Sequence, residues 1–64
     1  MIVRRYLFTF RGTGPFANQR KQVEGQGQTV DGAERMARAR LRDETKRDSS
    51  FWATESRDYL GAAE

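Results

Sequence analysis

Apolar and polar residues alternate along residues 2–11, IVRRYLFTFR. Three of the even positions are aromatic, Tyr6, Phe8 and Phe10, and isoleucine and valine open the segment. A period of two with aromatic and β-branched residues is typical of a β-strand that buries one face. We therefore predict a strand whose aromatic face forms the core. The alternative is that the rings are exposed and stack on nucleic-acid bases.

A turn signal follows in GTGP at residues 12–15, where Pro15 restricts φ and the glycines accept positive φ. Roughly residues 17–25 are mostly polar and contain no further proline. That composition favours an edge strand that returns antiparallel to the first.

The third segment carries a helical period. Four apolar residues of the predicted helix, about residues 30–47, follow the spacing i, i+3, i+4, i+8: Ala33, Met36, Ala37 and Leu41. They predict one narrow stripe of mostly small side chains facing the core. Thr29 or Asp31 can cap the first turn, and Glu34 stands three residues after Asp31, as in a capping box.

Residues 48–50, DSS, favour a break in the helix. The next segment, FWATESRDYL at residues 51–60, alternates in a way that predicts a third strand. A short helix fits nearly as well and would carry Trp52, Ser56, Tyr59 and Leu60. The expected fold class is α+β, a single small domain over residues 1–64 in the order β-β-α-β, with one helix packed on one face of a three-stranded antiparallel sheet.

The composition argues against several kinds of chemistry. A chain of 64 residues forms only a small core. It contains no cysteine and no histidine, so disulfides, thiolate chemistry and the commonest metal ligand are absent. We expect no enzymatic activity, no cofactor, no metal site and no small-molecule substrate.

The apolar runs are only two or three residues long, far short of the length that spans a bilayer. The first residues, MIVRRYLF, also lack the apolar stretch of a secretory signal. We therefore expect a cytoplasmic protein without a membrane partner.

The charge is unevenly distributed. Twelve basic against nine acidic residues give a net charge of +3, and residues 1–22 contain five cations and no acid. Such a basic front favours polyanions or acidic protein surfaces as partners. Ten of the twelve cations are arginine, which suits bidentate recognition of phosphate or carboxylate, although a GC-rich gene would also enrich arginine.

On a helical wheel, four cations fall on one side of the helix, because steps of three, four and four residues nearly complete whole turns. These are Arg35, Arg38, Arg42 and Lys46. Like charges on one ridge repel, which favours a contact surface for an acidic partner. The alternative is an ordinary solvated face, with ion pairs from Glu34 to Arg38 and from Asp43 to Arg47. Arg4 and Arg5 on the first strand complete the candidate site.

Residues 25–41 resemble part of the double-stranded-RNA-binding domain, in which a G-x-G-x-S/T turn precedes an alanine-spaced helix. The matching positions are Gly25, Gly27, Thr29, Ala33 and Ala37. That resemblance implies a strand, a capped turn and a helix. The phosphate-gripping lysines of that family are here Val30, Asp31 and Glu34, so its mode of binding does not carry over.

In size, composition and β-β-α-β order the chain is similar to small accessory proteins of phages and mobile elements, anti-CRISPR proteins among them. The similarity implies a non-enzymatic protein that inhibits or modulates a host protein or nucleoprotein complex. The alternative is a small nucleic-acid-binding protein that contacts phosphates with the basic helix and first strand. An apolar patch at Val3 and Leu7 would also suit a homodimer.

Overall fold

The computed structural model describes residues 2–62 and places three strands, one helix and two short 3-10 turns along the chain. Their order is β1 (Arg4–Gly12), η1 (Gly14–Phe16), β2 (Arg20–Gly27), α1 (Val30–Thr45), η2 (Ser49–Phe51) and β3 (Trp52–Ala62). The predicted β-β-α-β order is therefore confirmed, and the last segment is a strand rather than a helix.

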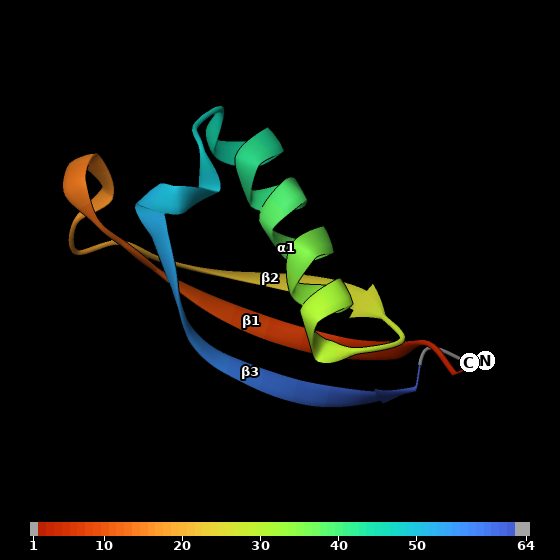
Figure 1. Ribbon diagram of the computed structural model, residues 1–64. Coiled ribbons are helices and arrows are strands. Elements are labelled where there is room, and N and C mark those ends of the chain that lie inside the picture. Colours follow the sequence, from red (N-terminus) through yellow and green to blue (C-terminus); the bar gives the residue numbers. More distant parts are fainter. Residues whose placement is uncertain (1, 63–64) are drawn as a thin grey trace.

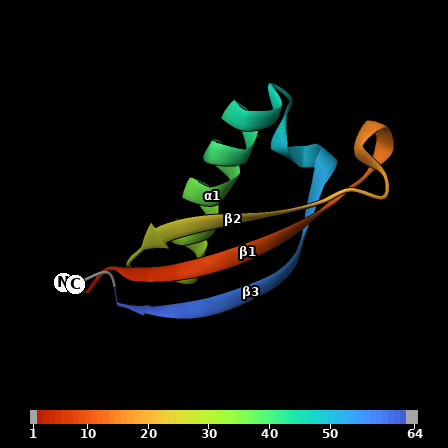
Figure 2. The same ribbon diagram turned by 180° about the vertical axis from the view of Figure 1, so that it is seen from behind.

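The three strands form one antiparallel sheet in the order β2-β1-β3, so that the first strand lies in the centre. Phe8, in the middle of β1, lies opposite Val23 on one neighbour and Arg57 on the other. The helix packs on one face of this sheet, and no described element covers the other face (Figures 1 and 2). We call this uncovered side the open sheet face. It carries the odd-numbered side chains of β1, because successive residues of a strand point to opposite faces.

The core lies between the sheet and α1 and consists of seven buried apolar residues. They are Phe8, Phe10, Val23, Ala33, Ala37, Leu41 and Trp52. Tyr6 packs against this cluster, so the aromatic stripe of the first strand faces the helix and forms the core. The rings of Phe8 and Phe10 are fully buried and therefore cannot serve as a stacking platform for bases.

The prediction that Met36 faces the core as part of the apolar stripe was wrong. Met36 is 41% exposed, whereas Ala33, Ala37 and Leu41 are fully buried. At about 100° per residue, Met36 lies roughly 100° from the centre of the line formed by the other three. The helix lies so close to the sheet that only this narrow line is covered.

Two glycines on β2 explain this close approach. A Cβ atom on Gly25 would lie 2.1 Å from the carbonyl oxygen of Ala33, and one on Gly27 would lie 2.7 Å from the Ala33 nitrogen. The helix backbone thus packs directly on the strand, with alanine on one side and glycine on the other. The glycine and alanine spacing of residues 25–37 therefore serves helix packing.

The helix begins with a capping hydrogen bond from the backbone nitrogen of Gly32 to the side-chain oxygen of Thr29, at 3.1 Å. The capping box predicted between Asp31 and Glu34 was wrong, because Glu34 points toward β3 and bonds there. The helix ends at Thr45, two residues earlier than predicted, where Lys46 adopts a left-handed conformation with φ of 60°. This αL residue closes the helix by donating its N–H to the Arg42 carbonyl.

Candidate binding surface

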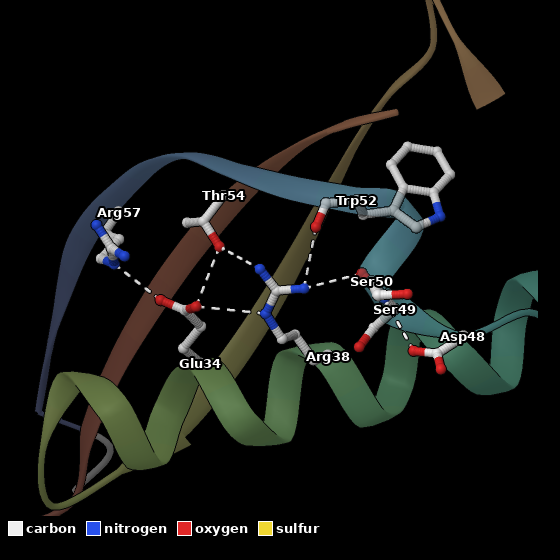
Figure 3. A network of polar contacts seen from close by, with 8 residues as sticks. All are labelled: Glu34, Arg38, Asp48, Ser49, Ser50, Trp52, Thr54 and Arg57. Atoms are coloured by element: carbon white, nitrogen blue, oxygen red, sulfur yellow. Dashed lines mark hydrogen bonds and ion pairs between the residues drawn. The ribbon is translucent and has the colours of Figure 1, made fainter. Parts of the chain in front are cut away.

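The four cations predicted to share a ridge on α1 do not all point the same way. Arg35, Arg42 and Lys46 are exposed on the side of the helix away from the sheet. The fourth, Arg38, is half-buried, and its side chain turns into the gap between α1 and β3 (Figure 3). We call the first three residues the helix cation face.

The guanidinium of Arg38 joins the helix to the segment that leads into β3. Its Nη1 donates to the backbone carbonyls of Ser49 and Trp52, at 2.9 and 3.0 Å. Its Nη2 donates to the hydroxyl of Thr54 at 2.9 Å, and the group lies 5.2 Å from the centre of the Phe10 ring. With so many donors used inside the fold, Arg38 acts as a structural connector between α1 and β3.

Glu34 is the acidic centre of the same network (Figure 3). It accepts hydrogen bonds from Arg38 at 3.3 Å, from Arg57 at 2.8 Å and from Thr54 at 3.1 Å. Burial raises the pKa of this carboxyl, but the hydrogen bonds from Arg57, Thr54 and Arg38 outweigh burial and hold the pKa below its ordinary value. The ion pair between Glu34 and Arg38 was one of the two predicted for a solvated face.

The helix cation face has no such partners. Within residues 2–62, no ion pair or side-chain hydrogen bond involves Arg35, Arg42 or Lys46, whereas each described glutamate is paired. The glutamate pairs are Arg5 with Glu24, Arg20 with Glu55, Lys21 with Glu44, and Arg38 and Arg57 with Glu34. The described glutamates are thus neutralised locally, whereas the side chains of these three cations form no such contact within residues 2–62.

Two acids lie beside the helix cation face. Asp31 and Asp43 are exposed on α1, and neither forms an ion pair in the described part of the chain. The predicted pair between Asp43 and Arg47 is not formed there. The basic surface is therefore a short set of cations with negative charge close by, not a continuous positive track.

The two cations of the first strand lie away from this surface. Arg4 donates from Nη1 to the carbonyl of Gln28 at 2.7 Å, next to the turn that precedes the helix. Arg5 belongs to the open sheet face and lies 3.6 Å from Glu24. Val3 and Leu7, the predicted apolar patch, are only half-buried. The structure thus separates the six predicted site residues into a helix surface, an internal connector and two sheet positions.

One basic pair was missed in the sequence. Arg11 on β1 lies directly opposite Arg20 on β2, on the open sheet face near the end of the hairpin. Together with Asn18 and Gln19 these residues line a cavity of about 260 Å³. Finding this pair from the sequence requires the register of the two strands, which depends on the length and shape of the turn.

The described residues were also searched for a metal site and for a membrane-spanning helix. No three carboxylates within residues 2–62 gather in a group that could hold a metal ion. No helix in that range is long and apolar enough to cross a membrane. Comparison with known protein families, curated proteins and solved structures gives no match.

Proposed function

We propose that the protein is a non-enzymatic binding protein that attaches through its helix cation face to an acidic surface of a host macromolecular complex and inhibits or modulates that complex. One observation carries this proposal. The side chains of Arg35, Arg42 and Lys46 form no ion pair or hydrogen bond within residues 2–62, whereas each described glutamate is paired. Like charges on one side of a helix repel and destabilise it, and no ion pair within the described residues offsets this repulsion.

The spacing of these cations suits a small acidic patch. Arg35 and Arg42 are two helical turns apart, about 10 Å, and Lys46 lies about one turn further on. A protein surface can place carboxylates against these three positions while it avoids Asp31 and Asp43. A nucleic-acid backbone presents phosphates continuously and would meet those two acids as well, so an acidic protein surface is the better match.

The class of partner rests on the similarity to small accessory proteins of phages and mobile elements, anti-CRISPR proteins among them. Such proteins generally act by covering a surface of a host machine, and this mode requires no cofactor and no chemistry. The proposal places the chain in the cytoplasm, where such machines work. Nucleic-acid binding through the helix and first strand remains the alternative, although Arg5 on the open sheet face does not adjoin the helix cations.

The test is affinity capture from a host lysate, followed by titration of the captured complex with wild type and with the double variant Arg35→Glu, Arg42→Glu. Charge reversal opposite an acidic patch should weaken binding by about 2 kcal/mol or more, roughly 30-fold, and slow association. Raising the salt concentration should weaken the wild-type complex, because exposed charges are screened. A matched control is Arg11→Glu, Arg20→Glu, which changes the charge equally on the opposite side of the sheet.

Two results would contradict the proposal. If the helix double variant binds the complex as tightly as wild type, the helix cation face is only a solvated surface. If the chain instead binds free DNA or RNA at submicromolar concentration and physiological salt, the nucleic-acid alternative takes first place. We expect only weak nucleic-acid binding that falls steeply with salt.

A further inference from the structure

Arg11 and Arg20 form a like-charged pair across two neighbouring strands. They are direct partners in the register of β1 and β2, so their Cβ atoms lie roughly 5 Å apart on one face of the sheet. Like charges placed directly opposite each other destabilise a sheet. Both side chains belong to exposed residues, so neither is needed to fill the core.

The fold neutralises only part of this pair. The Nε of Arg20 lies 3.2 Å from a carboxylate oxygen of Glu55, which reaches it from β3 across the central strand. The terminal nitrogens of Arg20 form no hydrogen bond within residues 2–62, and Arg11 forms no ion pair there at all. One carboxylate thus faces two guanidinium groups, and the local charge remains positive.

The surroundings of the pair form a concave site. Asn18 and Gln19 line the same cavity of about 260 Å³, and each of these residues has a side-chain amide. The hairpin end is held in shape, because Gly12 donates its N–H to the Gln19 carbonyl at 2.8 Å and Asn18 adopts a left-handed φ of 68°. In Figures 1 and 2 this end of the hairpin projects beyond the helix, so α1 does not cover it.

We propose that this hairpin pocket, lined by Arg11, Asn18, Gln19 and Arg20, binds a phosphate monoester. The planar guanidinium groups suit bidentate bonding to phosphoryl oxygens, and the amides add further donors. The cavity, about 260 Å³, lies just below the roughly 300–1,000 Å³ of sites that hold whole small molecules, so it suits a small or terminal group. Because the local charge stays positive beside Glu55, a monoester with a charge of about −1.5 to −2 and three terminal oxygens is attracted more strongly than a diester with a single charge. The pocket is independent of the helix cation face.

The experiment is a titration of the isotope-labelled protein with inorganic phosphate, followed by NMR at constant ionic strength. We expect saturable shifts at the backbone amides of Asn18 and Gln19 and at the Nε of Arg11. Arg11→Gln should weaken binding at least tenfold, whereas the control Arg47→Gln, at an exposed cation that follows the helix, should bind as wild type does. The free Arg11→Gln protein should also melt about 2 °C higher, because the like-charge repulsion is removed.

Two further probes define the ligand. Phenyl phosphate should bind and lose affinity below about pH 6, where a monoester gains its second proton, whereas dimethyl phosphate should bind at least tenfold more weakly. A phosphoserine amide that binds as tightly as inorganic phosphate supports the site and identifies a phosphorylated side chain as its source. Preference for inorganic phosphate also supports the site and identifies the free ion. Equal shifts with sodium chloride alone, unchanged affinity in Arg11→Gln, or equal binding of the diester would overturn the proposal.

Discussion

The Nη2 of Arg38 donates a hydrogen bond of 2.9 Å to the hydroxyl of Thr54 and so joins the middle of the helix to the third strand. These residues are sixteen positions apart, and the same guanidinium also binds the two carbonyls that lead into β3. An arginine that appears on a helical wheel as one of four equivalent cations is thus part of the packing between α1 and β3. The helix cation face consists of the other three.

Arg38→Gln should therefore destabilise the fold. The substitution leaves the carbonyls of Ser49 and Trp52 without their charged donor, and hydrogen bonds to charged groups contribute about 1.5–3 kcal/mol. Because the side chain is partly exposed, we expect a loss of about 2 kcal/mol in the free energy of unfolding, measured by urea denaturation. The control Arg42→Gln, on the exposed side of α1, should change it by no more than about 0.5 kcal/mol. Equal midpoints for the two variants would show that the network contributes nothing.

Gly25→Ala and Gly32→Ala should change stability in opposite directions. A Cβ atom on Gly25 would lie 2.1 Å from the Ala33 carbonyl oxygen, so the helix must move away, at a cost of about 3 kcal/mol or more. At Gly32, in the first turn of the helix, an added Cβ atom would lie 3.4 Å from the Thr29 hydroxyl, and alanine should add about 0.5 kcal/mol through its helix propensity. Thermal melting of both variants checks this. A stable Gly25→Ala protein would mean that helix and strand are not in direct contact.

Phe8→Ala should remove most of the stability of the domain. The Phe8 side chain is fully buried at the centre of the sheet, and truncation of a buried phenylalanine costs about 3–5 kcal/mol. The comparison is Leu60→Ala, since Leu60 is 43% exposed and should tolerate truncation. Circular dichroism at increasing temperature distinguishes the two. A melting temperature within a degree or two of wild type for Phe8→Ala would contradict the burial of the aromatic stripe.

Acid should weaken the fold partly through Glu34. The pKa of this carboxyl is lower in the folded protein than its ordinary value of 4.5, so its contribution to stability is present above that value and is lost as the pH falls through the lower, folded pKa. Glu34→Gln should lower the free energy of unfolding at pH 7 and have a much smaller effect at pH 2 to 3. Urea titrations at both pH values measure this difference. An equal loss at both pH values would assign the role of Glu34 to packing rather than to charge.

Local sequence patterns predicted the helix and the first two strands, but they fitted either a strand or a short helix to the last segment. The alternating segment around Phe8 forms a strand, and the apolar spacing of Ala33, Ala37 and Leu41 forms the buried line of the helix. Thr29 was one of two candidate caps and is the one observed. These features depend on residues within a turn or two along the chain, so their physical causes are contained in short stretches of sequence.

Only the tertiary structure decided which side chains are available to a partner. The distance between helix and sheet, set by Gly25 and Gly27, leaves Met36 outside the core, and the position of β3 draws Arg38 inward. The register of the hairpin places Arg11 opposite Arg20. Each of these outcomes depends on contacts between residues far apart in the chain and on the reach of long side chains, and a helical wheel or an alternating pattern contains neither quantity.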